Sequence, residues 1–228
     1  MGAKNGMPIG LGYLSVSFGI GILAAQYGLS TLIATLVSAT NLTSAGQAAG
    51  LAVIAAGGTI IEMILTQFVI NLRYALMGIS LSQRLSPAFT TKHRFLAAFG
   101  ITDEIFAVAS TRAKPVTPAF MYGLISVSFI GWVGGTFIGA SAGHLLPTQI
   151  VNAMGITLYG MFLAIMIPPA KKNGGVLFVI ILTAALSVAF KFLLPMISSG
   201  FTVIICAVLS SIIGALLFPV TKKEEDTV

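Results

Sequence analysis

"QFVINLRYALMGIS", residues 67–80, is an apolar run of the kind that lies in a lipid bilayer, but it carries Asn71 and Arg73 near its middle. A charge at bilayer depth costs about 2.5 to 3.5 kcal/mol on insertion scales, so such a residue usually faces a cavity or pairs with another charge. The stretch therefore predicts a membrane helix with a polar site, and a partner for Arg73 elsewhere in the chain.

The composition of the whole chain agrees with a membrane environment. Of its 228 residues, 57% are hydrophobic and only 8% are charged, and the mean hydropathy is +1.01. Soluble domains carry charge on about a quarter of their residues. No stretch remains for an aqueous catalytic domain, and no nucleotide-binding G-x-x-x-x-G-K-[ST] motif occurs. The chain is therefore not expected to hydrolyse nucleotide by itself.

Apolar windows of about 19 residues predict about seven membrane-spanning helices. They cover residues 8–26, 31–56, 59–82, 116–143, 148–168, 175–194 and 197–218. The segment 95–111 is apolar at both ends but polar at its centre, and its halves are too short to cross alone. We expect an all-α, polytopic membrane protein forming one membrane domain over residues 1–228, with a re-entrant or broken hairpin at 95–111.

Basic residues in the loops indicate the topology, because cytoplasmic loops are enriched in Lys and Arg. These residues are Arg84, Lys92, Arg94, Arg112, Lys114, Lys171, Lys172, Lys222 and Lys223. If 95–111 enters and returns without crossing, all of them are cytoplasmic; the N-terminus is then outside, with Lys4 as the exception. If the segment crosses, Arg84, Lys92 and Arg94 move outside. We favour the re-entrant interpretation.

Short words recur at nearly constant spacing. "YLSVSFGIG" at 13–21 resembles "LISVSFIGW" at 124–132, "FVINL" at 68–72 resembles "FVIIL" at 178–182, and Asn41 and Asn152 have the same separation. The pattern predicts a three-helix repeat with halves 8–82 and 116–194, followed by a final helix at 197–218. With the topology above the copies are inverted, a common plan in secondary transporters.

A helix break is predicted inside 31–56. Small and hydroxylated side chains between Asn41 and Gly46 compete with helical hydrogen bonds, and a break there exposes backbone groups to a cavity. The alternative is a Ser/Thr/Gly-rich face that packs closely on another helix. The candidate substrate-binding residues are Asn41, Thr43, Ser44, Gly46, Gln47 and, on the next helix, Asn71.

Three of the six acids lie outside the C-terminal tail, namely Glu62, Asp103 and Glu104. Glu62 is eleven residues from Arg73, about 16 Å along a helix, and cannot pair with it. We expect Arg73 to pair with Asp103 or Glu104 and so to pin the hairpin; the alternative is that Arg73 extends to the interface. The three acids are the candidates for taking up a coupling proton.

Four glycines, Gly131, Gly135, Gly139 and Gly143, form a stripe that lets another helix approach closely. We favour a helix of the same chain over a partner. His93 is expected to be a solvated loop residue, His144 an interfacial residue or a proton relay, and Cys206 a small buried hydrophobe. No cluster suits a metal, a cofactor or a catalytic triad, so the chain is not expected to be an enzyme.

Three stretches, "NLRYALMGISLSQRL" at 71–85, "ITDEIFAVA" at 101–109 and residues 38–47, resemble the signature regions of the AzlC family, membrane subunits of branched-chain amino-acid exporters. Two departures concern substrate more than fold: Tyr74 stands where the family often has His, and residues 44–48 read Ser-Ala-Gly-Gln-Ala where it has Gly-Ser-Ala-Gln-Phe. The resemblance implies gradient-driven export across the bacterial plasma (inner) membrane, with a small AzlD-type membrane subunit. A homo-oligomer is an alternative assembly.

Three functions compete at this point. A secondary transporter exporting branched-chain amino acids such as valine, or other small apolar amino acids, fits the resemblance and the predicted breaks. A passive channel fits the same architecture, whereas an intramembrane enzyme needs a nucleophile and a base that the sequence does not contain. Nucleic-acid binding is not expected, because the net charge of +6 lies in short loops that face the lipid bilayer surface.

Overall fold

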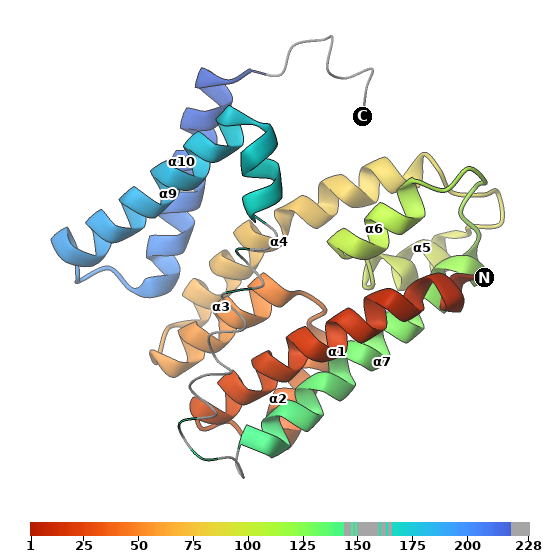
Figure 1. The fold of residues 1–228 in the computed structure, drawn as a ribbon, viewed down its shortest axis with the longest axis horizontal. Coiled ribbons are helices and arrows are strands. Elements are labelled where there is room, and N and C mark those ends of the chain that lie inside the picture. The colour runs from red at the N-terminus through yellow and green to blue at the C-terminus, as the bar shows by residue number, and fades with distance from the viewer. Residues whose placement is uncertain (144–146, 148, 150–159, 161–162, 164–165, 220–228) are drawn as a thin grey trace. The chain divides into compact units, whose positions relative to one another are not determined.

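The computed structural model describes residues 1–143, 147, 149, 160, 163 and 166–219 (Figure 1). Its labelled helices are α1 (Gly2–Gln26), α2 (Thr31–Thr40), α3 (Ser44–Ala55), α4 (Ile60–Ser82), α5 (Thr91–Ala98), α6 (Asp103–Ser110), α7 (Pro118–Gly143), α9 (Gly174–Leu193) and α10 (Ser199–Leu217). Five of them, α1, α4, α7, α9 and α10, are long and apolar enough to cross a membrane. The prediction of an all-α polytopic membrane protein is confirmed. The predicted span 148–168, Asn152 and His144 lie mostly or wholly outside the described residues.

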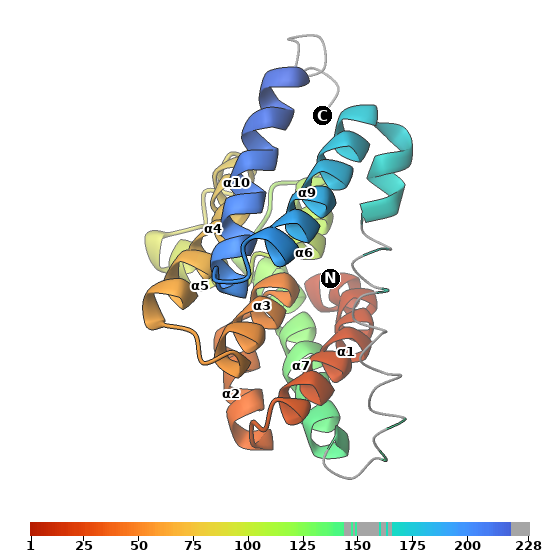
Figure 2. The ribbon, with the colours of Figure 1, turned by 90° about the vertical axis from the view of Figure 1, so that its left-hand side faces the viewer.

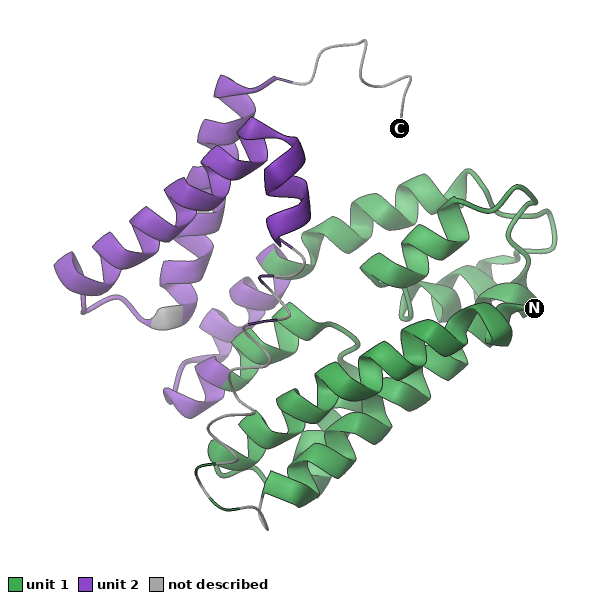
Figure 3. Cartoon of the chain, in the orientation of Figure 1, with its two compact units in different colours: residues 1–51, 70–158 green, residues 52–69, 159–228 purple. Residues whose placement is uncertain are grey.

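The chain divides into two compact units, residues 1–51 with 70–158 and residues 52–69 with 159–228 (Figure 3). The division passes within α3 and within α4. In the second unit α9 and α10 lie side by side (Figure 2). No residue of α9 is buried, so its apolar side chains are available to lipid.

Helices α1 and α7 pack along their whole length in the first unit (Figure 1). A Cβ atom added to Gly131 would collide with the backbone of Gly10, and one added to Gly139 would collide with the backbone of Phe18. Gly6 approaches Leu124 in the same way. Backbones this close need a glycine on at least one of the two helices at each contact. The predicted glycine stripe therefore packs against α1 of the same chain.

The order of these contacts sets the relative direction of the two helices. Gly2 lies against Phe120, Gly10 against Gly131, and Gly143 against Ile22 and Ala25. Residue numbers rise together on both helices, so α1 and α7 run parallel. This differs from the expectation of inverted copies, in which the first helices of the two halves run in opposite directions.

The two ends of the segment between α4 and α7 lie next to each other. The Ser86 amide donates to the Val116 carbonyl (2.9 Å), and the Val116 amide donates to the Arg84 carbonyl (2.9 Å). A crossing would separate these residues by roughly 30 Å of hydrocarbon. Helices α5 and α6, eight residues each, thus form a hairpin that enters and returns on one side, which we call the α5–α6 hairpin.

The segment between α1 and α4 also enters and returns. Gly2 and Ala3 lie beside Phe120 and Gly123, so the N-terminus is on the same side as the base of the α5–α6 hairpin. With α1 and α4 both crossing, residues 27–59 start and end on the opposite side. Helices α2 and α3, ten and twelve residues long, are too short to cross singly and form a second hairpin, the α2–α3 hairpin.

This topology corrects the expected orientation of the N-terminus. The sequence treated 31–56 as a crossing helix, which placed the N-terminus opposite the basic loops. Because 31–56 turns back at Asn41, the N-terminus lies with Arg84 and Lys92 instead. Lys4 then obeys the positive-inside rule with the other loop residues.

Candidate functional site

A polar cavity of about 150 Å³ lies between the tips of the two hairpins. Its walls come from the break between α2 and α3, from α4, and from the turn between α5 and α6. The lining residues are Thr40, Asn41, Leu42, Thr43, Asn71, Tyr74, Ala98, Phe99 and Ile101. Of the predicted substrate-binding residues, Asn41, Thr43 and Asn71 line the cavity, whereas Ser44, Gly46 and Gln47 do not.

The break leaves two helix ends facing this cavity. Helix α2 ends at Thr40 and α3 begins at Ser44. The Thr43 hydroxyl accepts a hydrogen bond from the Gly46 amide (3.3 Å), as an N-cap residue does. The C-terminal carbonyls of a helix carry partial negative charge and the N-terminal amides partial positive charge. The break therefore offers complementary partners to an ammonium group and a carboxylate.

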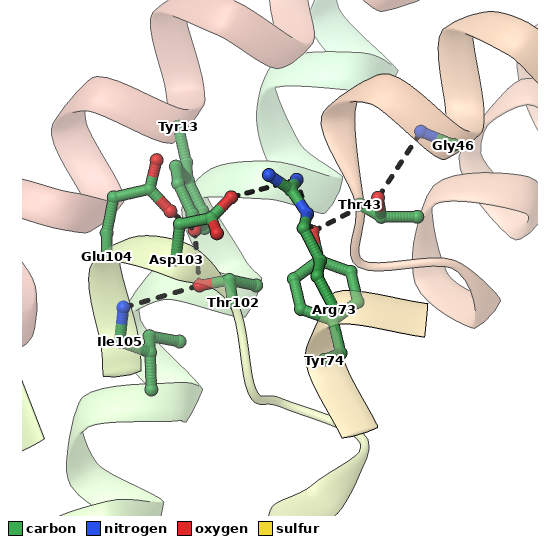
Figure 4. A network of polar contacts seen from close by, with 9 residues as sticks. All are labelled: Tyr13, Thr43, Gly46, Arg73, Tyr74, Thr102, Asp103, Glu104 and Ile105. Atoms are coloured by element: carbon green, nitrogen blue, oxygen red, sulfur yellow. Dashed lines mark hydrogen bonds and ion pairs between the residues drawn. The ribbon is translucent and has the colours of Figure 1, made fainter. Parts of the chain in front are cut away.

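Arg73 forms the ion pair that its position in an apolar helix requires (Figure 4). Its Nη2 lies 2.9 Å from Asp103 Oδ2 and 3.2 Å from the Tyr74 hydroxyl. Tyr74 in turn donates to the Thr43 hydroxyl (3.2 Å). The Arg73 and Asp103 side chains are 43% and 40% exposed, so the pair borders open space. Together these contacts link α4 to the tips of both hairpins.

The pKa of the Asp103 carboxyl is raised above its ordinary value. Burial raises this pKa most, the Arg73 guanidinium lowers it, and the negative charge of Glu104 raises it again. Two adjacent carboxylates disfavour the state in which both are ionised. Arg73 and Glu104 therefore act on the Asp103 carboxyl in opposite directions.

Glu104 contacts α1 rather than Arg73. The Tyr13 hydroxyl is hydrogen-bonded to the Glu104 carboxylate and lies 2.6 Å from Thr102 Oγ1 (Figure 4). Tyr13 is only 8% exposed. Thr102 also caps α6 by accepting from the Ile105 amide (3.4 Å).

Gln47 belongs to a buried network beside the cavity. Trp132 Nε1 donates to Gln47 Oε1 (3.1 Å), and Gln47 Nε2 donates to Ser38 Oγ (2.5 Å). Ser38 Oγ lies 2.7 Å from Thr136 Oγ1. The Trp132 ring also meets the Tyr13 ring edge-on, with centroids 5.4 Å apart. This network joins α2 and α3 to α7. Through Trp132 it also contacts Tyr13, which is hydrogen-bonded to Glu104.

Glu62 belongs to the second unit, where it binds the start of α10. Its side chain is 3% exposed and accepts from Ser198 Oγ (2.5 Å) and from the Gly200 amide (2.9 Å) at the start of α10. A carboxylate there is favoured by the positive end of the helix. Within the second unit, Glu62 therefore joins the start of α4 to the start of α10.

An apolar cavity of about 330 Å³ adjoins the same hairpin. Its lining includes Gly78 and Ile79 of α4 and Met121 of α7. Ala98 and Ile101, at the tip of the α5–α6 hairpin, line both this cavity and the polar one. The hairpin tip is therefore the wall that the two cavities share.

Comparison with known proteins places the site in a family. The family model described as AzlC protein matches residues 8–146. The chain belongs to the AzlC family. The matched region contains both hairpins and α7 in its described part, and with them Tyr13, Arg73, Asp103, Glu104 and Trp132. The family is consistent with a membrane-embedded transporter.

Two relatives support the AzlC assignment. Inner membrane protein YgaZ of Escherichia coli (strain K12) is 29% identical over 222 residues, which are 94% of this chain and 89% of that protein. An uncharacterized membrane protein of Archaeoglobus fulgidus is 30% identical over 166 residues, 72% of each chain. No solved structure matches this AzlC chain.

Sequence reasoning missed the aromatic members of the site. Tyr13 and Trp132 are the first and last residues of the recurring words at 13–21 and 124–132, so the words themselves carried a signal. His93 was expected to be solvated, which is wrong. Its Nδ1 is hydrogen-bonded to the Tyr122 hydroxyl (2.7 Å) and its ring packs edge-on against Phe89, because α5 lies against α7.

Proposed function

We propose that this AzlC-family chain is a secondary transporter that exports branched-chain amino acids such as valine, or other small apolar amino acids, across the bacterial plasma membrane. Export is coupled to the proton gradient. The observation that carries the proposal is a polar cavity held between two hairpins that enter from opposite sides. An enzyme needs reacting groups at such a cavity, whereas Asn41, Thr43, Asn71 and Tyr74 are suited to binding.

The cavity provides for each part of an amino acid. The amides at the start of α3 attract the α-carboxylate, and the carbonyls at the end of α2 attract the α-ammonium group. Asn41 and Asn71 supply amide groups that donate or accept. Leu42, Phe99 and Ile101 supply apolar wall for an aliphatic side chain.

The two hairpins give a route for alternating access. Each tip covers the cavity from one side of the membrane, so displacement of one hairpin opens the cavity to that side only. Discontinuous helices at a midplane site serve this purpose in secondary transporters. The Arg73–Asp103 pair holds the α5–α6 hairpin against α4 in the closed position.

Three acids are candidates for binding the coupling proton: Asp103 and Glu104 beside the cavity, and Glu62 in the second unit.

We also propose that the chain works with a small AzlD-type membrane subunit. No residue of α9 is buried, so the apolar side chains of this helix offer a surface on which that subunit can pack within the lipid. A homo-oligomer is the alternative assembly. Copurification of the chain with the neighbouring small membrane protein, or its elution as a self-associated species, distinguishes the two.

The experiment that tests the function is efflux from proteoliposomes loaded with labelled valine. A proton gradient should drive valine out of the vesicles against a valine gradient. An uncoupler should abolish this uphill efflux. A leaky channel equilibrates valine regardless of the uncoupler, so uncoupler-insensitive flux contradicts the proposal and supports a passive channel. Lysine, which is charged, is the matched control substrate and should not be exported.

A further inference from the structure

We infer that Glu104, through its hydrogen bond with Tyr13, is the residue that binds the coupling proton, and that Asp103 stays ionised as the partner of Arg73. The inference rests on the proposed proton-coupled export and selects one of its three candidate acids. The geometry of the Tyr13–Thr102–Glu104 cluster carries it.

The cluster can hold Glu104 in either protonation state without losing a hydrogen bond. A phenol or an alcohol has one hydrogen to donate and lone pairs that accept. With Glu104 ionised, Tyr13 donates to the carboxylate and the Thr102 hydroxyl donates to Tyr13. With Glu104 protonated, the carboxyl donates to Tyr13, and Tyr13 donates to Thr102 Oγ1, 2.6 Å away. The coupling proton is bound to a carboxyl oxygen of Glu104 in the protonated state and has been released in the ionised state.

Asp103 has no such alternative. Protonation of its carboxyl removes the negative charge 2.9 Å from Arg73 and leaves a guanidinium on a membrane helix without its counter-ion, which is costly. Burial and the charge of Glu104 raise the Asp103 pKa, against the lowering by Arg73. A proton on Glu104 removes one of the two neighbouring negative charges and keeps the Arg73–Asp103 ion pair, which favours Glu104 over Asp103 as the proton-binding residue.

The surroundings of Glu104 suit proton exchange. The Glu104 side chain is exposed, whereas Tyr13 and Thr102 are buried. In the described part of the chain, the titratable or charged groups interacting with the cluster are Tyr13 of α1, Arg73 and Tyr74 of α4, and Asp103 of α6. From α7 the cluster meets Trp132, which does not titrate.

The cluster also reaches the second hairpin. Tyr13 contacts Trp132, whose indole N–H is bonded to Gln47 in α3. Reversal of the hydrogen bonds at Tyr13 thus acts directly on α6. It acts on α3 through two further contacts, the Tyr13–Trp132 ring contact and the Trp132–Gln47 hydrogen bond. A single proton on Glu104 can bias both gates of the cavity.

The test is an infrared pH titration of the purified protein in lipid, without any substrate. A protonated carboxyl has a carbonyl stretch that an ionised one lacks. We expect a titrating band in the wild type that disappears in Glu104→Gln and persists in Asp103→Asn and Glu62→Gln. Tyr13→Phe removes a hydrogen-bond partner and should keep the band but shift its frequency. Thermal unfolding of each variant establishes that it is folded.

Three results would overturn the inference: no carboxyl band that depends on Glu104, a band lost in Asp103→Asn instead, or a band whose frequency is indifferent to Tyr13→Phe. The proposed function fails separately. If the Glu104 band is present but the wild type exports no amino acid, the proposed export of amino acids is contradicted, whereas Glu104 as the proton-binding residue is retained. If the wild type exports valine and Glu104→Gln retains the full dependence on the proton gradient, the proton site is wrong and the substrate stands.

Discussion

Arg73 shows how one charged residue organises this molecule. It lies in an apolar helix, and its partner Asp103 comes from a hairpin thirty residues further along the chain. The side chains are both partly exposed, so the pair is expected to contribute only about 1 kcal/mol in an aqueous setting. Its importance is positional, because it fixes the α5–α6 hairpin to α4 beside the cavity.

The first prediction concerns this pair. Arg73→Asp or Asp103→Arg alone places two like charges together, which is worse than simple loss of the ion pair. Either change should reduce the rate of valine export in proteoliposomes roughly tenfold, equivalent to about 1.4 kcal/mol. The double variant Arg73→Asp/Asp103→Arg restores opposite charges and should recover part of the rate. Absence of any recovery, with the double variant folded, argues against pinning by this ion pair.

A second residue-scale prediction concerns Gln47, which the sequence assigned to substrate. Gln47→Leu leaves the Trp132 N–H without its acceptor in a buried position and should lower the free energy of unfolding by about 1 to 3 kcal/mol. Gln83→Leu removes the same amide from an exposed position and is the control, expected to change stability by at most about 0.5 kcal/mol. Equal melting temperatures for the two variants would contradict the structural role.

At the scale of elements, glycines decide how closely α1 and α7 approach. Gly135 faces the backbone of Leu14 and the hydroxyl of Ser17, whereas nothing lies within 4 Å of a Cβ atom at the adjacent Gly134. Packing of this kind replaces the hydrophobic effect as the force between helices in lipid.

The two glycines form a matched pair for a third prediction. Gly135→Ala should lower the melting temperature, because the methyl group forces the helices apart. Gly134→Ala should leave it unchanged or raise it, since alanine is favoured over glycine in a helix by about 1 kcal/mol. Thermal unfolding in detergent measures both. A loss of stability at Gly134 as large as at Gly135 would mean that helix packing is not the cause.

The whole molecule carries the fourth prediction, which is its topology. In a background with Cys206 replaced by Ala, Lys4→Cys and Lys92→Cys should react with an impermeant maleimide from the cytoplasmic side only. Ala56→Cys, in the connection between α3 and α4, should react from the outside only. Labelling of Lys4→Cys from outside would restore an outside N-terminus and exclude the returning α2–α3 hairpin.

Much of the site could be predicted because polar residues stand out in an apolar chain. The residues from Asn41 to Gly46 marked the break, and Arg73 needed an acidic partner. Choosing between Asp103 and Glu104 was not possible, because neighbouring residues on a helix point about 100° apart and only the packing decides which one faces α4. Tyr13 and Trp132 escaped notice since aromatic side chains in spans are ordinary.

Hydropathy by itself determined that this protein is a bundle of membrane helices, and it located the described spans to within a few residues except at the start of α1. It did so because each residue's transfer free energy depends on its own side chain. Tertiary structure alone decided the direction of the segments: that 31–56 turns back, that α1 and α7 run parallel, and that the N-terminus lies with the basic loops. Direction depends on contacts between residues far apart in the chain, such as Gly10 with Gly131, and no local property records them.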